Sequence, residues 1–392
     1  MRCLNATVSP LLQRAIDQLV GEEGIPPQKL AEAVTDLSHL FTKGRSQLNQ
    51  GYLDHRILRA AYLQYFMPVN LGKVQVLLNE MSAPEPVTVF SVLDLGSGPG
   101  TGALAVLDWW HQLAMPHPLS MITVDSSAAA LGQARALWER YWKSASVRAA
   151  NLQTHEGDLE RRAWVEQVKG RQEFDLIVLA NCLNEVYVDA RDPIAMRLDL
   201  VREALSLLTL HGTLMIIEPA LRETSRELHQ VRDRLLQEKQ CSIYSPCLHE
   251  LNCPALVKPD DWCHEERPWD PPGIIQQIDE QVGFIKDALK FSYLLLRKDG
   301  QTIVDRKPDV YRVVSELREL KGEKRAWLCN EQGRHEVGRQ DRLASPQNES
   351  FDQWHRGAIV QIEKIVHKER RGKVSPLGRV EQDALVRIIC ST

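Results

Sequence analysis

A glycine-rich turn at residues 96–102 is the part of the sequence whose composition points most directly to a bound cofactor. It follows the apolar run FSVLDL, residues 90–95, and contains Gly96, Gly98 and Gly100. Glycine has no Cβ and adopts positive φ, so ligand atoms can approach the backbone, and the N–H groups of a helix starting after the turn point at the same place. The pattern predicts a cofactor loop between a buried strand and a helix, although a bare match to GxGxxG does not identify the cofactor.

Acidic residues stand at the ends of the segments that follow. Asp125 closes the run MITVD, Asp158 lies in the turn THEGDL, and the strand-like run EFDLIVLANCLNEV, residues 173–186, leads into a polar loop. An acid after the second strand is where a ribose-binding carboxylate belongs in nucleotide-binding α/β folds. Together with Asp94, which precedes the glycine turn, the series resembles the class I S-adenosylmethionine-dependent methyltransferases, and no second nucleotide-binding half follows it. The resemblance implies an α/β, Rossmann-like core that binds S-adenosyl-L-methionine.

The resemblance also implies roles for individual residues. In that family the glycine loop contacts the methionine part of the cofactor, the acid after the second strand holds the ribose hydroxyls, and the acid of the GD pair approaches the adenine. The residues expected to bind the cofactor on this basis are Asp94, Gly96, Ser97, Gly98, Gly100, Asp125, Ser126, Asp158, Leu159 and Asn181.

The loop ANCLNEVYVDARD, after the fourth expected strand, is where an acceptor pocket is expected. It lacks the NPPY or DPPY signature of transferases that methylate the exocyclic amine of adenine. Asn181, Asn184 and Glu185 are candidates for binding the acceptor or the cofactor, and Glu218, which closes the fifth expected strand, is a candidate base, so the catalytic residue stays unknown. Cys182 lies near the nucleophile position of pyrimidine carbon-5 transferases, but its apolar neighbours predict a buried structural thiol.

Half of the eight cysteines fall within residues 241–270. Clustered cysteines in a reducing compartment more often bind metal or serve redox chemistry than form disulfides. The spacing Cys247-x5-Cys253-x9-Cys263 is not the CxxC pair of a zinc ribbon, so a metal site needs a fourth ligand from elsewhere. The candidates for that ligand are Cys241, His249, His264 and the distant Cys329.

A narrower resemblance covers most of the chain. The strings SPCLHELNCPAL, DDWCHEERPW, RSQLNQGYL, AAYLQYFMPVNL, DLGSGPGTG and KFSYLLL are similar to those of the small-ribosomal-subunit methyltransferase-like family, whose mitochondrial members are called methyltransferase-like protein 17. The resemblance implies a four-iron, four-sulfur (4Fe–4S) cluster held by Cys247, Cys253, Cys263 and Cys329, with a structural zinc as the alternative. Four protein thiolates leave a cluster no open site, so we expect it to hold the insertion in place.

The same resemblance implies a function at the small ribosomal subunit. We expect an S-adenosylmethionine-dependent methyltransferase-like protein that acts on or binds small-subunit ribosomal RNA (rRNA) in ribosome assembly or translation. One alternative is a catalytically inactive RNA-binding assembly factor that S-adenosylmethionine and an iron–sulfur cluster stabilise. Another is a methyltransferase for a small molecule or a protein, which predicts no salt-dependent binding of rRNA.

Two or three domains are expected, because 392 residues exceed one ordinary core, and the sequence pattern divides the chain into three. Helical periodicity predicts a helical N-terminal domain over residues 1–85. The methyltransferase domain is expected over 86–300, with the Cys-rich, metal-binding insertion at 241–270. Several short strand-like runs separated by turn residues predict a small β-barrel over 301–392, of the oligonucleotide-binding (OB) type that engages single-stranded RNA.

Basic residues gather in two segments. In the first, Lys43, Arg45 and Arg56 stand near the aromatic residues Tyr52, Tyr62, Tyr65 and Phe66. This pattern fits either helix packing with solvated basic heads or contact with RNA or the cofactor. The second segment, HKERRGKVSPLGR, is either an RNA-binding face of the barrel or an exposed basic loop. Its basic residues include Lys368, Arg370, Arg371, Lys373 and Arg379.

Composition limits which binding partners and which cellular compartment are expected. The formal net charge of −4 gives no global nucleic-acid signature, so RNA binding has to depend on local patches. No stretch is long enough to span a bilayer, and Asp17, Glu22 and Glu23 argue against a transit peptide. We expect no membrane partner, a monomer when free, and a cytoplasmic location, or the mitochondrial matrix for a eukaryotic homologue.

Overall fold

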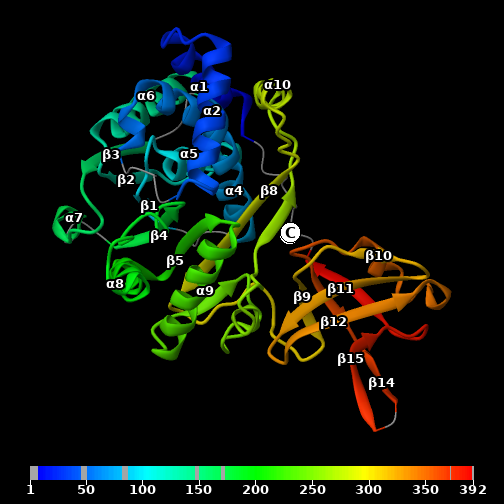
Figure 1. The fold of residues 1–392 in the computed structure, drawn as a ribbon. Helices are drawn as coiled ribbons and strands as arrows, with labels where there is room; N and C mark the ends of the chain where they lie inside the picture. The colour runs from blue at the N-terminus through cyan, green and yellow to red at the C-terminus, as the bar shows by residue number, and fades with distance from the viewer. Residues whose placement is uncertain are drawn as a thin grey trace. The chain divides into compact units, whose positions relative to one another are not determined.

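The computed structural model describes residues 8–45, 51–81, 87–145, 150–168, 173–370 and 372–390, and the chain divides into two compact units (Figure 1). The glycine-loop unit includes Leu4–Leu221 and Pro268–Leu289. The cysteine unit includes Arg222–Arg267 and Lys290–Thr392. Each unit draws on chain segments that are far apart in the sequence. The expected division into three domains at residues 85 and 300 stays a prediction.

Helices come first in the described part of the glycine-loop unit. They are α1 Pro10–Glu22, α2 Pro27–Thr42, α3 Arg56–Ala61 and α4 Met67–Glu80, with the short helices η2 Tyr52–Asp54 and η3 Tyr62–Phe66 between them. Helix α1 starts at a proline, and Ser9 caps it by accepting the Leu12 N–H at 3.2 Å. Leu12, Ile16 and Leu19 are buried on one face, as the helical period of the sequence predicts.

A parallel sheet forms the centre of the same unit. Its strands are β1 Phe90–Leu95, β2 Leu119–Asp125, β3 Ala150–Glu156, β4 Phe174–Ala180 and β5 Leu208–Pro219, and they lie in the order β3-β2-β1-β4-β5. The connecting helices are α5 Thr101–Gln112, α6 Ala128–Ala145, α7 Ala163–Val168 and α8 Pro193–Ser206. Because the chain leaves β1 in one direction and later returns to its other side, right-handed crossovers place α5 and α6 on one face and α8 on the opposite face (Figure 1). The α/β, Rossmann-like core is confirmed, and its strand order reverses beside β1.

The cysteine unit starts with a long helix. Helix α9, Arg222–Gln237, is followed by β6 Ser242–Ser245, the short helix η4 Pro254–Leu256, β7 Glu265–Pro268 and β8 Ala288–Arg297. Strand β6 pairs antiparallel with β8. The Cys-rich segment 241–270, expected from the sequence as an insertion, contains two short strands and a helical turn. Helix α10, Gly273–Val282, belongs to the glycine-loop unit.

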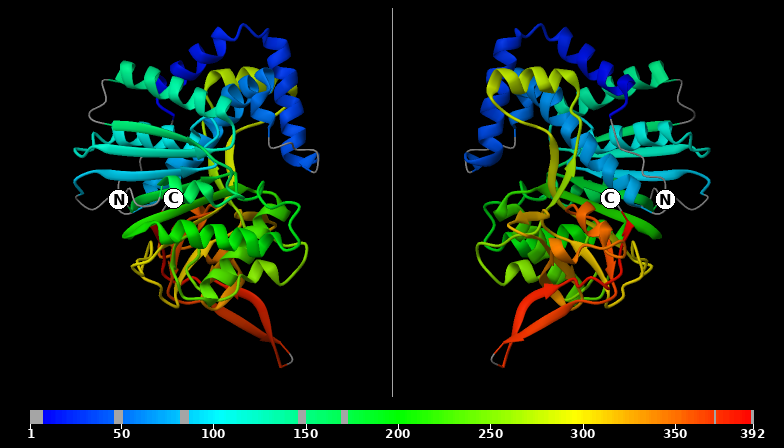
Figure 2. Two further views of the ribbon diagram at one scale, coloured as in Figure 1. Left: turned by 90° about the vertical axis from the view of Figure 1, so that its left-hand side faces the viewer. Right: turned by 90° about the vertical axis from the view of Figure 1, so that its right-hand side faces the viewer.

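A second sheet of eight strands completes the cysteine unit. Its strands are β9 Val310–Val313, β10 Arg318–Leu320, β11 Glu323–Asn330, β12 Gly333–Gln340, β13 Ile359–Ile362, β14 Val366–Arg370, β15 Lys373–Arg379 and β16 Val386–Cys390. The order is β14-β15-β12-β11-β9-β13-β16, with β10 on β11, and the sheet curls around a core that includes Phe351 and Trp354. Strands β14 and β15 form a hairpin that extends from the rest of the sheet (Figure 2). Among the described helices, none is both long enough and apolar enough to cross a membrane.

Candidate cofactor and metal sites

The glycine turn adopts backbone conformations that side chains other than glycine rarely take. Gly96, Gly98 and Gly100 have φ angles of 66°, 53° and 83°. A Cβ on Gly96 would lie 2.5 Å from the Cys182 Cβ, so this position also needs glycine for space. The loop follows β1 and leads into α5, whose first turn bonds back to the loop: the Thr101 N–H donates to the Ser97 carbonyl at 3.2 Å.

Asp94 is tied to the start of α5. Its Oδ2 accepts the Ala103 N–H at 2.8 Å, and the side chain is 1% exposed. Burial raises the pKa of this carboxyl to about 7. Asp94 therefore fixes the turn between β1 and the helix, which is a positioning role beside the cofactor contact that the sequence predicts.

Asp125 connects the end of β2 to the glycine loop. Its Oδ2 accepts the Gly98 N–H at 2.7 Å, and its Oδ1 accepts the Ser127 N–H at 2.9 Å. Burial raises the pKa of Asp125, and these backbone hydrogen bonds oppose that shift. Each carboxylate oxygen has a further lone pair, so the acid retains capacity for hydroxyl donors such as those of a ribose. The neighbouring Ser126 is exposed.

Asp158 and Leu159 lie in the turn after β3. The Oδ1 of Asp158 accepts the Glu160 N–H at 2.9 Å, and its carboxylate pairs with Arg161 at 3.4 Å. Leu159 is buried, and its Cδ1 lies 3.5 Å from the place where a Gly96 Cβ would be. The structure therefore brings the third acid segment to the same end of the sheet as the glycine loop.

The ends of β4 and β5 bring the acceptor candidates together. Asn181 has a φ of 58° and donates its backbone N–H to the Ile217 carbonyl at 2.7 Å. Glu218 is 1% exposed; its Oε1 accepts the Leu183 N–H at 3.1 Å, and its Oε2 is buried with no hydrogen-bond partner among the described atoms. Burial raises the pKa of Glu185 to about 7 and that of Glu218 to about 8.

Cys182 is a packing residue in this structure. Its Sγ–H donates to the Leu95 carbonyl at 3.2 Å, and the residue is 9% exposed. Burial raises its pKa well above the usual thiol range, and the nearby acids add to that shift. A thiol held in this state is a poor nucleophile, which agrees with the structural role predicted from its neighbours.

The N-terminal segment packs directly on the cofactor loop. The Leu53 Cδ1 lies 3.5 Å from the place of a Gly98 Cβ, and Asp54 Oδ1 accepts the Ser127 Oγ–H at 2.6 Å. Arg45 donates to Asn184 Oδ1. The sequence singled out Arg45 but missed Leu53 and Asp54, because these contacts link segments far apart in the chain. Of the other residues in this segment, Lys43 and Arg56 are exposed, whereas Tyr52 and Tyr65 are buried.

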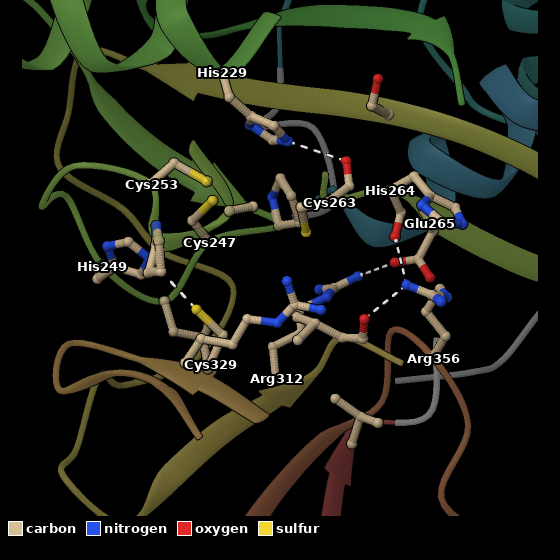
Figure 3. A pocket seen from close by; sticks show the side chains of 18 of the residues that line it. His229, Cys247, His249, Cys253, Cys263, His264, Glu265, Arg312, Cys329 and Arg356 are labelled. Carbon is tan, nitrogen blue, oxygen red and sulfur yellow. Dashed lines mark hydrogen bonds and ion pairs between the residues drawn. The ribbon is translucent and has the colours of Figure 1, made fainter. Parts of the chain in front are cut away.

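The four expected cysteine ligands line one cavity of about 50 Å³ in the cysteine unit (Figure 3). Cys247 and Cys253 follow β6, Cys263 precedes β7, and Cys329 comes from β11. His249 and His264 line the same cavity, whereas Cys241 is not among its lining residues. Among the described residues, no three His, Cys, Asp or Glu side chains are arranged so that they could hold a single metal ion.

Helix α9 holds the cysteine-bearing loop by its backbone. Arg226 donates to the carbonyls of Ala255, Leu256, Lys258 and Asp261 at 2.6–3.3 Å. His229 Nε2 lies 3.1 Å from the Cys263 carbonyl, and Asp233 accepts the Cys253 N–H at 2.9 Å. Arg232, which is fully buried, donates to the carbonyls of His249 and Leu251, both at 2.8 Å. The sequence carried no signal for these four residues, because each acts on main-chain atoms.

Positive and hydrogen-bond-donating groups surround the cysteine cavity. Strand pairing places Arg312 and Arg334 directly opposite Cys329 on its two neighbouring strands. The Nε atoms of Arg334 and Arg356 and the Nδ1 of His264 are buried with no hydrogen-bond partner among the described atoms. Burial, together with the charge of neighbouring cysteines, raises the pKa values of Cys253, Cys263 and Cys329, that of Cys263 to about 11.

The C-terminal basic residues divide between the hairpin and the sheet. Lys368 and Lys373 are exposed on β14 and β15. Arg379 pairs with Glu323 within the sheet. Arg371 lies outside the described residues, as does the side chain of Arg370. The segment, which the sequence leaves open as an RNA-binding face of the barrel or an exposed basic loop, forms a hairpin with at least two exposed lysines.

Comparisons with known proteins agree with the second resemblance described above. A family model described as mitochondrial small ribosomal subunit Rsm22 matches residues 56–339. No curated protein matches the chain.

Among solved structures, the fibrillarin/Nop5p complex has 14% identity and a TM-score of 0.32 over 57% of this chain and 80% of that one. The small RNA methyltransferase HEN1 has 13% identity and a TM-score of 0.36 over 59% and 25% of the two chains. The CurJ carbon methyltransferase has 16% identity and a TM-score of 0.37 over 74% and 72%.

Proposed function

The chain belongs to the Rsm22 family of the mitochondrial small ribosomal subunit, and on that premise we propose that it binds S-adenosyl-L-methionine at the glycine loop and acts on small-subunit rRNA. The contacts expected for the cofactor are those of the glycine loop, Asp125 and the Asp158–Leu159 turn. The proposed role is methyl transfer to RNA during assembly of the small subunit.

The charge around the glycine loop is the observation that carries this proposal. Asp125, Glu185 and Glu218 gather at the carboxyl ends of β2, β4 and β5, and burial raises the pKa of each. A dinucleotide would bring an anionic pyrophosphate toward these carboxyls, which is unfavourable. S-adenosylmethionine brings a sulfonium and an ammonium group, whose positive charges favour the ionised carboxylates.

Calorimetry with purified S-adenosylmethionine tests the cofactor site. We expect Gly98→Arg, which fills the loop beside Leu53, and Asp125→Ala to abolish binding. Asp36→Ala removes an exposed acid on α2 and serves as the control that keeps wild-type affinity. Normal affinity of the Gly98 and Asp125 variants would remove both residues from the site.

The contacts of Glu218 fit either loop support or catalysis. One of its carboxylate oxygens accepts the Leu183 N–H, which suits loop support, while the other has no partner among the described atoms and can contact the methyl-accepting substrate.

In the alternative function, S-adenosylmethionine stabilises a catalytically inactive assembly factor instead of donating a methyl group. Transfer of radiolabelled methyl groups to small-subunit rRNA separates the two functions: no labelled RNA at saturating cofactor favours the inactive factor.

If methyl transfer occurs, Asn181, Glu185 and Glu218 are the residues for proton transfer or acceptor binding. Loss of transfer in Glu218→Gln with unchanged cofactor affinity would assign Glu218 to the chemistry. A methyltransferase for a small molecule or a protein is the third function, and it predicts cofactor binding without affinity for rRNA.

We also propose that Cys247, Cys253, Cys263 and Cys329 hold a 4Fe–4S cluster. In support, four thiols line a cavity of about 50 Å³, whereas about 10–15 Å³ is enough to hold one water molecule. The unmatched N–H donors of Arg334 and Arg356 suit an anionic group with sulfide acceptors. Each thiolate of such a cluster binds a different iron, whereas zinc draws its four ligands to one point. When bound, the cluster supplies a crosslink between the cysteine-bearing loop and β11.

Anaerobic purification tests the cluster against zinc. Visible absorption with iron and sulfide in equal amounts supports the cluster, whereas colourless protein with zinc supports the alternative. Cys253→Ser is expected to lose the metal. The matched control is Cys241→Ser, because Cys241 lies in the same segment but does not line the cavity.

We propose that the second sheet is an OB-like barrel and that its β14–β15 hairpin contacts RNA. The exposed Lys368 and Lys373 support this role, because lysine side chains can neutralise RNA phosphates. Each phosphate contact with a single strand makes the plot of log binding constant against log salt concentration steeper by about 0.7. We expect the combined alanine variant of Lys368, Arg370, Arg371 and Lys373 to bind rRNA more weakly and with a shallower salt slope. Lys307→Ala, an exposed lysine outside the hairpin, is the control. Unchanged RNA affinity of the hairpin variant would remove it as the RNA site.

We propose a monomer when free, located in the cytoplasm, or in the mitochondrial matrix when the cell is eukaryotic. The mass of the purified protein by light scattering tests the first statement, and fractionation of cells tests the second.

A further inference from the structure

His249 contacts one of the four cysteine-cavity thiols directly. Its Nε2 lies 3.6 Å from the Cys329 Sγ, which is within hydrogen-bonding distance for sulfur. The residue is 2% exposed, and Arg232 fixes its backbone by donating to its carbonyl at 2.8 Å. Within the described part of the chain, no side chain has a hydrogen bond to the sulfur of Cys247, Cys253 or Cys263. The contact therefore distinguishes Cys329 from the other three cysteines.

The position of the ring proton follows from its surroundings. The Nδ1 of His249 is buried with no hydrogen-bond partner among the described atoms. A neutral imidazole has one N–H and one lone pair, and a buried N–H without an acceptor is costly. A thiolate sulfur has no proton to give and acts only as an acceptor. The favourable arrangement therefore places the proton on Nε2, directed at Cys329.

We propose that His249 donates an Nε2–H hydrogen bond to the Cys329 thiolate and thereby raises the reduction potential of the iron–sulfur cluster. This inference rests on the cluster assignment made above. Reduction adds negative charge to the cluster and its thiolates, so a hydrogen bond to sulfur stabilises the reduced state more than the oxidised state. His249 is thus a positioning and tuning residue, not a ligand.

The midpoint potential of the cluster tests this role, measured by a redox titration followed by electron paramagnetic resonance. His249→Leu removes the donor, and His249→Gln keeps an N–H group of similar reach. We expect the leucine variant to have a lower midpoint potential, by about the 59 mV that corresponds to a tenfold change in a one-electron equilibrium. The glutamine variant is expected to stay close to the wild type.

His264→Leu is the matched control. His264 lines the same cavity, but no hydrogen bond joins it to a sulfur atom among the described residues. An equal fall in potential for the His264 and His249 leucine variants would overturn the inference, because general loss of polarity would then explain both. An unchanged potential in His249→Leu would overturn it as well.

Two further measurements separate the possible failures. If the purified wild-type protein contains no iron and sulfide, both the cluster assignment and this inference are overturned. If it contains them but His249→Leu leaves the midpoint potential unshifted, only the inference is overturned. If His249→Leu does not assemble the cluster, electron–nuclear double resonance of the reduced wild-type and His249→Gln proteins decides. An exchangeable proton coupled to the cluster in both supports the hydrogen bond, and its absence from the wild type contradicts it.

Discussion

Gly96 sits where the cofactor loop leaves least room for a side chain. Its φ is 66°, and an added Cβ would lie 2.5 Å from the Cys182 Cβ and 2.8 Å from its Sγ. Gly24 offers a matched position, because its φ is 59° and nothing lies within 4 Å of an added Cβ. The two sites therefore separate backbone strain from crowding.

We predict that Gly96→Ala lowers the free energy of unfolding more than Gly24→Ala does. Gly24→Ala should cost about 1 kcal/mol for the left-handed conformation alone, and crowding should add about 1–3 kcal/mol at Gly96. Chemical denaturation of both variants measures the difference. Equal losses would mean that Cys182 moves aside at little cost.

The raised pKa of Glu218 predicts how the stability of the protein changes with pH. Burial raises its pKa to about 8 in the folded protein, whereas an unfolded glutamate titrates near its ordinary value. Between these two pKa values the folded state binds more protons than the unfolded state, so the free energy of unfolding falls as the pH rises. We predict a decline from about pH 5 to pH 8 in the wild type and a shallower decline in Glu218→Gln.

Denaturation at several pH values measures this slope. Glu139→Gln, at an exposed position on α6, is the control and should keep the wild-type slope. A Glu218→Gln slope equal to that of the wild type would show that Glu218 stays ionised in the folded protein.

At the scale of elements, α9 is the scaffold of the cysteine-bearing loop. Arg226 alone bonds four carbonyls between Ala255 and Asp261. We predict that Arg226→Ala increases hydrogen exchange across residues 247–263 and lowers iron content, because the thiols are no longer held at fixed positions. Arg222→Ala, an exposed arginine on the same helix, is the control. Unchanged exchange in Arg226→Ala would mean that the loop is held by other contacts.

The sequence predicted the elements whose signals are local. Asp94 and Asp125 could be found because each ends or nearly ends an apolar run, and the glycines directly after β1 marked the loop. The hairpin of β14 and β15 could not be predicted, because its basic residues do not alternate with apolar ones; Gly372, with a φ of 72°, lies at its turn.

Contacts between distant segments could not be predicted. Leu53 and Asp54 reach the cofactor loop from a segment that carries no cofactor motif. Arg226 and Arg232 bind main-chain carbonyls, which every residue possesses, so no pattern of residue types reveals their partners. The cysteines were found because their type alone suggests a ligand, whereas the groups that position them were not.

At the scale of the whole molecule, the two candidate sites belong to different units. All four cysteines lie in the cysteine unit, and the expected S-adenosylmethionine contacts lie in the glycine-loop unit. We predict that Cys253→Ser loses metal and lowers the melting temperature but leaves the affinity for S-adenosylmethionine within about twofold of the wild type, since contacts in separate units are largely additive. Calorimetry and thermal unfolding measure the two effects. A large loss of cofactor affinity would reveal coupling between the units.

The source of the fourth thiol has a consequence for synthesis of the chain. Cys247, Cys253 and Cys263 come from one segment, whereas Cys329 comes from β11, in a sheet that also needs β9 and β12. A nascent chain therefore exposes three thiols well before the fourth has been translated and folded. The fourth cysteine can bind the proposed cluster only after β11 has formed. Complete binding of the cluster would therefore occur only after residue 329 has been translated.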